Sequence, residues 1–135
     1  MTVHHERLSV TTEKRLATVD ITARVRTAVT RSKVRGGICV VASTHTTAAI
    51  FVNENADPDV QRDLLSHLGK LVPQDDGFAH AEGNADAHIK AVLTGNDVAV
   101  PVRDGELALG TWQGIYLAEF DGPRERHVVV TVVGE

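Results

Sequence analysis

The sequence predicts an α+β domain in which strands build most of the core. Valine-rich runs such as Ile38–Val41 and Val128–Val133 carry the β-branched residues typical of strands. Helical spacing of apolar residues occurs in only three short segments. With 135 residues, the chain has the size of one compact domain spanning 1–135. Because only 4% of the residues are aromatic, we expect a core of Val, Ile, Leu and Ala.

Strands are predicted in consecutive pairs along the chain. Residues 3–10 and 16–20 flank a polar turn, and 38–43 and 48–52 flank a loop that contains His45. Two further short strands at 97–102 and 107–109 lie on either side of Asp104–Gly105. Three hairpins are predicted: 3–10 with 16–20, 38–43 with 48–52, and 112–120 with 127–133.

Capping residues set the predicted helix ends. The first helix has Asp20 as N-cap and stops at Gly36–Gly37, and the second has Asp57 as N-cap with Pro58 at its first position. The third begins at Asn84 or Asp86 and closes at Gly95–Asn96. The apolar positions expected on one face of each helix are Ile21, Val25, Ala28 and Val29; Val60, Leu64, Leu68 and Leu71; and Ile89, Val92 and Leu93.

Several strands must be covered on both sides. The run Val128–Val133 is apolar on both faces, which is typical of a strand buried from two directions. Three short helices provide little cover for such a sheet. We therefore expect contact with another subunit.

Charge is divided unevenly along the chain. Residues 1–52 hold eight Lys/Arg and three Asp/Glu, a net +5, and residues 53–135 hold six and fifteen, a net −9, which together give the formal −4. This acidic balance argues against general nucleic-acid binding. We expect the basic and acidic residues to form two oppositely charged faces of one domain or complementary surfaces between subunits. Scattered solvated charges on a monomer are the alternative.

A single cysteine, Cys39, lies within an apolar run, so no intrachain disulfide can form and an intracellular setting is favoured. The N-terminal residues lack the apolar core of a signal peptide, and no segment approaches the ~18 apolar residues of a membrane span. We therefore expect a cytoplasmic protein without a membrane partner.

The stretch Ser43–Ala49 places His45 among hydroxyls directly after an apolar strand. Such a cluster suits a phosphate or a metal, and a Ser/Thr-rich turn with a solvated histidine is the alternative. Downstream, His80, Asp86 and His88 bring two imidazoles and a carboxylate into nine residues. Near a helix N-terminus the neutral imidazole needed by a metal is favoured, although this spacing matches no tight zinc pattern.

The segment Gly110–Gly114 contains the only tryptophan. A glycine inside a strand, here Gly114, predicts close approach of another group to the backbone. Trp112 is either a core or interface anchor or a flat wall for a heteroaromatic substrate. Thr111 and Gln113 add hydrogen-bonding groups beside it.

Four motifs occur in order along the chain: His45–Ala49, Asn53–Val60, Glu82–Lys90 and Gly110–Glu119. Through these motifs, the sequence resembles the secondary thiamine-phosphate synthase (YjbQ-like) family over nearly its whole length. The resemblance implies a two-sheet β-sandwich core with about three helices, assembled through its sheets as a homotrimer. It also implies a polar pocket near a subunit boundary.

The resemblance further implies a reaction and a set of site residues. A pyrimidine-methyl diphosphate would be joined to a thiazole phosphate with release of diphosphate, Glu54 and Lys90 acting in catalysis. A divalent ion, zinc or magnesium, would be held by His45, His80 and His88. The implied substrate-binding residues are Thr46, Thr47, Asn84, Thr111, Trp112 and Gln113. The alternatives are a non-catalytic trimer that binds a phosphorylated metabolite or a metal, and a hydrolase in which a metal-bound water attacks a phosphoester.

Overall fold

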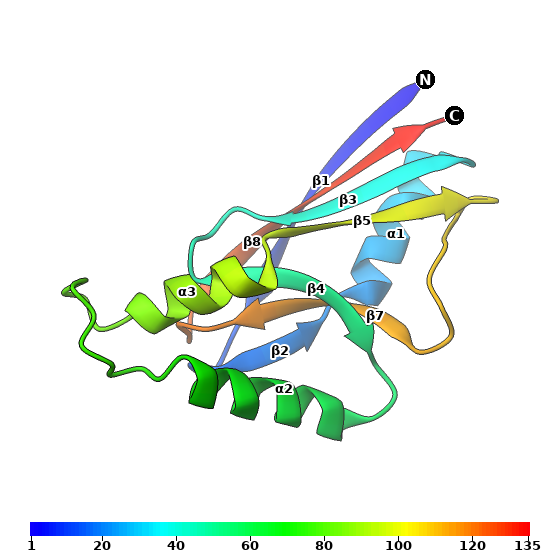
Figure 1. The fold of residues 1–135 in the computed structure, drawn as a ribbon. Helices are drawn as coiled ribbons and strands as arrows, with labels where there is room; N and C mark the ends of the chain where they lie inside the picture. Colours follow the sequence, from blue (N-terminus) through cyan, green and yellow to red (C-terminus); the bar gives the residue numbers. More distant parts are fainter.

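Two antiparallel sheets and three helices make up the computed structural model, which describes residues 1–135 (Figure 1). Sheet A has the strand order β1-β8-β3-β5-β6, and sheet B has the order β2-β7-β4. The predicted α+β class is confirmed. The elements in chain order are β1 Thr2–Thr11, β2 Ala17–Asp20, α1 Thr22–Ser32, β3 Gly37–Ser43, β4 Ala48–Glu54, α2 Pro58–Leu71, α3 Ala85–Thr94, β5 Asp97–Arg103, β6 Glu106–Leu107, β7 Gln113–Glu119 and β8 Glu125–Gly134.

The three predicted hairpins are wrong, because each of those strand pairs is divided between the two sheets. β1 pairs with β8, β2 and β4 both pair with β7, and β3 lies between β8 and β5. A two-residue hairpin forms only between β5 and β6, where Asp104 and Gly105 both have positive φ, of 52° and 78°. Two such residues match the right-handed twist of paired strands. The loops between the other consecutive strands contain no such pair of positive-φ residues and lead from one sheet to the other.

The main core lies between the inner faces of the sheets and one face of α1. Val25 and Val29 of α1 and Val41 of β3 are fully or almost fully buried there. Cys39 is also fully buried, and burial raises the pKa of its thiol to about 11. The close approach predicted at Gly114 is present, since a side chain there would meet Asn55 at 2.8 Å.

The helix ends follow the predicted caps only in part. Asp57 caps α2, its carboxylate accepting the Asp59 N–H at 2.9 Å. Asp20 accepts the Thr22 N–H at 2.9 Å, although Ile21 occupies the N-cap position of α1. The predicted stop at Gly36–Gly37 is wrong, because α1 ends at Ser32 and Lys33 takes the left-handed conformation. Gly37 instead begins β3 and packs directly against the backbone of β8.

The apolar face predicted for α3 does not reach the core. Val92 and Leu93 are 82% and 58% exposed, whereas Ala87 and Ala91 pack towards sheet B in a small second cluster. Small side chains allow α3 to lie close to the strands, and the larger ones are left outside. α2, in contrast to α3, has no fully buried residue at all. Both helices therefore leave apolar surface uncovered.

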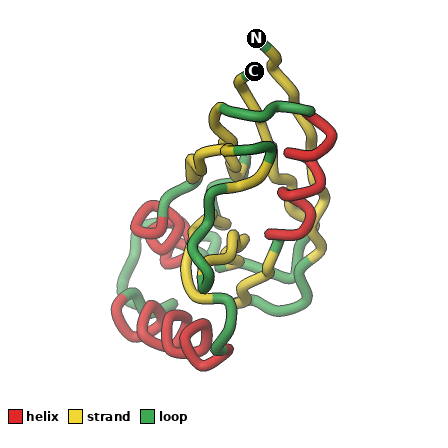
Figure 2. Tube along the Cα trace, turned by 90° about the vertical axis from the view of Figure 1, so that its right-hand side faces the viewer, coloured by secondary structure: helices red, strands yellow, loops and turns green.

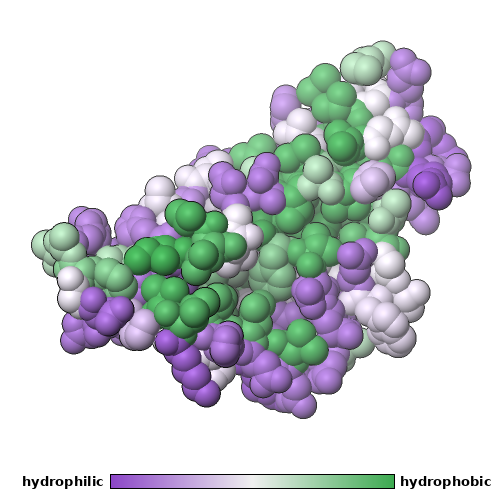
Figure 3. Space-filling model, viewed as in Figure 1, coloured by the Kyte–Doolittle hydropathy of each residue, from purple (hydrophilic) through white to green (hydrophobic).

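The outer face of sheet A is apolar as well. Residues of β8 alternate between fully buried and half-buried, and the half-buried Val129 and Val133 belong to this outer face with Ile38, which is 44% exposed. Figure 2 shows α1 on the opposite side of the molecule from α2 and α3. Figure 3 shows hydrophobic side chains in a band from sheet A towards α3 and α2. None of the helices is long and apolar enough to cross a membrane.

Candidate functional site

The His45 loop, residues 44–47, connects β3 of sheet A to β4 of sheet B. β3 ends opposite Val128, so the next residue of β8, His127, has no strand partner on that side. The loop supplies one: Nε2 of His45 accepts the His127 N–H at 2.8 Å, and the Thr44 hydroxyl donates to the His127 carbonyl at 3.4 Å. The two imidazoles also stack, with centroids 6.0 Å apart.

This hydrogen bond decides the chemistry of His45. Since Nε2 accepts a hydrogen bond from an amide N–H, the neutral ring carries its own proton on Nδ1. Burial lowers the pKa of His45 below 6.5, and the nearby charges of Arg126 and His127 lower it further. His45 therefore presents an uncharged N–H donor at neutral pH. A hydrogen-bond donor suits an anionic oxygen better than a cation.

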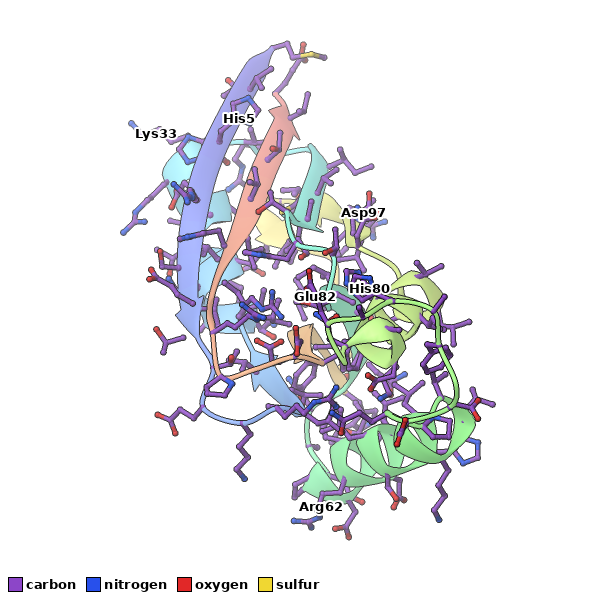
Figure 4. The ribbon with its side chains drawn as sticks, turned by 90° about the vertical axis from the view of Figure 1, so that its left-hand side faces the viewer. His5, Lys33, Arg62, His80, Glu82 and Asp97 are labelled. Atoms are coloured by element: carbon purple, nitrogen blue, oxygen red, sulfur yellow. The ribbon has the colours of Figure 1, made fainter.

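A pocket of about 480 Å³ lies between the His45 loop and α3. Its polar lining comes from His45, Thr46, His88 and Asn96, and its volume is in the range of small-molecule sites. His80 is not part of the lining but packs edge-on against His88, with ring centroids 5.2 Å apart. Figure 4 shows His80 and Glu82 side by side next to α3, and Nε2 of His80 lies 3.7 Å from a carboxylate oxygen of Glu82.

The three histidines of the predicted metal centre do not converge on one point within the single chain. Two of the three histidines, His45 and His88, do share a pocket, and His80 touches His88. No group of three His, Cys, Asp or Glu side chains is arranged to hold an ion, however. A metal ligand must offer a lone pair, and both ring nitrogens of His45 are committed, one to the His127 amide and one to its own proton. The residues do not fit zinc or magnesium.

A buried ion pair lies beneath the His45 loop. Arg126 and Glu119 are 3% and 0% exposed, and the Nε of Arg126 donates to Glu119 at 2.8 Å. Arg126 also donates to the Thr47 hydroxyl at 2.8 Å. Burial raises the pKa of Glu119, but hydrogen bonds from Arg126 and Thr12 outweigh it and bring the pKa below its usual value. The hydroxyl of Thr47, predicted to bind substrate, is thus buried against Arg126 in the single chain.

Lys90 is also committed to a structural contact. Its Nζ lies 2.6 Å from Asp86, and both side chains are buried, at 2% and 0% exposed. Arg15 donates to both oxygens of Asp86 from the other side, at 3.3 and 3.0 Å. Burial raises the pKa of Asp86, whereas these two cations lower it more. The ammonium of Lys90, for which a catalytic role was predicted, therefore lies against Asp86 in the single chain and does not line the pocket of His45 and His88.

Asn84 lies at the N-terminus of α3 and ties it to the end of β7. Its amide nitrogen donates to Asp121 at 2.8 Å, and Arg124 holds the same carboxylate at 3.1 Å. The oxygen of the Asn84 amide is buried without a partner. Asn84 does not line the pocket of His45 and His88. In the single chain, it positions α3 instead of contacting a ligand in that pocket.

The other predicted site residues lie at the opposite end of β4. Glu54 ends this seven-residue strand, about 20 Å from its start at the His45 loop. Glu54 pairs with Gln113, and next to it Trp112 is 64% exposed and Thr111 is exposed. The carboxylate of Glu54 accepts the Ala56 N–H at 2.9 Å. Within one chain, the predicted site residues Glu54 and Trp112 therefore lie apart from His45, and the resemblance places their common pocket near a subunit boundary.

Comparison with known proteins agrees with this fold. The model of the UPF0047 protein YjbQ-like family matches residues 6–135. The chain belongs to this family. Among its relatives, a UPF0047 protein of Methanocaldococcus jannaschii is 49% identical over 92% of this chain and 90% of its own, and YugU of Bacillus subtilis is 41% identical over 94% and 97%.

Solved structures of the family show the same architecture. A YbjQ-like protein from Sulfolobus solfataricus superposes with a TM-score of 0.96 at 38% identity, covering 98% of each chain. A YjbQ/UPF0047 protein from Clostridium acetobutylicum gives 0.94 at 48% identity, covering 95% of this chain and 99% of its own. Two sheets with three helices are thus the family fold.

Sequence reasoning missed the residues of β8 that hold the His45 loop. His127 and Arg126 lie outside the four motifs, and Glu119 is the last residue of the Gly110–Glu119 motif but had no predicted role. One signal was available: Arg126 is in phase with Val128, Val130 and Val132, the buried positions of the strand. A charged residue on the inner face of a strand indicates a buried partner. The sequence alone does not identify that partner as Glu119.

Proposed function

We propose that this chain binds a small phosphorylated metabolite in the pocket of His45 and His88. The observation that carries the proposal is the hydrogen bond from the His127 amide to Nε2 of His45, which leaves an Nδ1–H donor for a ligand. The Thr46 hydroxyl and the Asn96 amide line the same pocket. Arg124 and Arg126 contribute positive charge near His45. Neutral donors in a positive field suit phosphate oxygens.

Within this proposal the reaction is the one that the family resemblance implies. The carbon–oxygen bond between the pyrimidine methylene and diphosphate breaks, and a carbon–nitrogen bond to the thiazole phosphate forms. Negative charge develops on the departing diphosphate, so fixed donors at its oxygens lower the barrier. His45 and Thr46 stabilise the leaving group in this account. Trp112 provides a flat surface for the pyrimidine.

A homotrimer would bring the two halves of this site together. The apolar outer face of sheet A and the exposed Val92 and Leu93 of α3 support contact between copies. In a ring, one surface patch meets a different patch on the next copy. The end of β4 that carries Glu54 and Trp112 can then lie against the pocket of His45 on the neighbouring copy. A shared site accounts for motif residues that are about 20 Å apart in one chain.

A non-catalytic binding trimer is the second candidate. It is favoured by one observation: neither Glu54 nor Lys90 lines the pocket, and Lys90 is buried in an ion pair with Asp86. On that account the pocket holds a phosphorylated metabolite without converting it.

Purified protein incubated with both substrates separates these functions. The synthase predicts equal amounts of thiamine phosphate and diphosphate, with loss of both in His45→Gln and retention in His67→Gln, an exposed histidine of α2. Calorimetric binding of the pyrimidine-methyl diphosphate without turnover supports the binding module. Release of inorganic phosphate from thiazole phosphate alone indicates a hydrolase. Absence of both binding and turnover contradicts the proposal.

A further inference from the structure

The His45 loop is held at both of its ends by two successive residues of β8. At its start, the backbone of His127 exchanges hydrogen bonds with the side chains of His45 and Thr44. At its end, the Arg126 guanidinium donates to the carbonyl and the hydroxyl of Thr47, at 3.3 and 2.8 Å. Neighbouring residues of a strand point to opposite faces. One strand end can therefore hold the loop through its backbone and a side chain at once.

Arg126 is itself held in place by Glu119 of β7. It contacts Glu119 through two nitrogens, and Glu119 also accepts the Thr12 hydroxyl at 2.7 Å and the Asp121 N–H at 2.9 Å. Arg126 and Glu119 are both buried. A guanidinium held by two parallel contacts has little freedom to rotate. The position of Thr47, and with it the loop, is thus set by groups that never contact the pocket.

We propose that Arg126 and the backbone N–H of His127 are positioning groups that fix the ring of His45 with its proton on Nδ1. Because Nε2 already accepts the His127 N–H, it cannot accept a hydrogen bond from a ligand. The Nδ1–H group is then the only polar group of the ring that a ligand can contact. The site is thereby specific for oxygen acceptors such as phosphate. Use of this donor in catalysis rests on the proposed function, whereas its tautomer is a property of the chain alone.

Nuclear magnetic resonance of the ligand-free protein tests the proposal directly. In protein labelled with ¹⁵N, an N–H···N hydrogen bond transmits a scalar coupling between its two nitrogens. We expect a coupling between the His127 amide nitrogen and Nε2 of His45, and a ring proton on Nδ1 above the pKa of the ring. Absence of the coupling, or a proton on Nε2, overturns the proposal without any variant.

Two variants separate the backbone donor from the ring of His127. His127→Pro removes the N–H, and His127→Ala removes the stacked ring but keeps the N–H. We expect His127→Ala to retain Nδ1–H in His45 and His127→Pro to release the proton from Nδ1. A folded His127→Pro protein with an unchanged His45 tautomer contradicts the role of the amide. Because the measurement uses no substrate, its failure leaves the proposed function to be judged by the turnover assay.

Thr47→Val tests the role given to Arg126. The substitution keeps the shape of the side chain and removes the hydroxyl that Arg126 contacts at 2.8 Å. We expect the ring signals of His45 to shift and the coupling to weaken while the protein stays folded. Unchanged His45 signals overturn the positioning role of Arg126.

Discussion

The two ends of β4 hold their polar side chains in different ways. At the His45 end, Arg126 holds Thr47 of the loop and is itself fixed by the buried Glu119. At the Glu54 end, Trp112 is 64% exposed. The first end is complete as folded, and the second presents an open surface. This difference is the basis of our proposal that the first end binds a ligand and that the second end contacts a neighbouring copy.

The largest expected effect comes from breaking the buried pair at the first end. Arg126→Met leaves the Glu119 carboxylate buried without its cation, which costs about 3–5 kcal/mol of unfolding free energy. Urea denaturation measures this loss. The double variant Glu119→Gln with Arg126→Met should recover much of it, because no charge is left unpaired. A single variant as stable as the wild type would show that the pair does not support the loop.

His45→Gln should reduce turnover about 10²–10³-fold, the usual result of removing one donor to a developing negative charge. The fold should persist, since His45 is only partly buried. Steady-state kinetics with His67→Gln as the matched control measures the effect. A loss confined to KM would assign His45 to binding alone.

Lys90→Met should cost less than the loss of Arg126, because Arg15 still pairs with Asp86 through both oxygens. We expect a loss of about 1.5–3 kcal/mol, typical of a hydrogen bond to a charged group. Denaturation of Lys70→Met, an exposed lysine of α2, provides the control. If Lys90→Met abolishes turnover with no loss of stability, Lys90 is catalytic after all.

The smallest expected effect is a pH dependence of stability that originates in His45. Folding lowers the pKa of this ring below 6.5. The folded state then binds fewer protons than the unfolded state, so this contribution is fully present above pH 6.5 and is lost as the pH falls through the lower folded value. Denaturation across this range should show a stability gap between wild type and His45→Gln that narrows towards acid. A stability difference that widens towards acid would mean that folding raises the pKa of His45 instead of lowering it.

The sequence was most informative where the controlling contacts are local. The cap of Asp57 on α2 and the tight turn at Asp104–Gly105 depend on adjacent residues and could be predicted or recognised from type and order. Sheet pairing could not, because β1 and β8 meet through partners such as Leu8 and Val128, more than a hundred residues apart. Alternation of apolar and polar residues indicates that a segment is a strand, but it does not identify the strand with which it pairs.

The same limit applies to the site. The hydroxyl-rich loop of His45 could be recognised as a site from its motif. The hydrogen bond that decides its tautomer joins it to His127, 82 residues away. The surroundings of Lys90 could not be predicted, because the motif alone does not show whether a lysine faces solvent or a buried carboxylate such as Asp86.

Mixing two defective proteins tests the central claim that the ends of β4 from neighbouring copies form one site. His45→Gln and Trp112→Ala trimers are unfolded together, refolded as a mixture and titrated calorimetrically with the pyrimidine-methyl diphosphate. Random assembly should restore binding at about a quarter of the sites, where an intact His45 faces an intact Trp112 of the next copy. A mixture that binds no better than either parent would contradict the shared site.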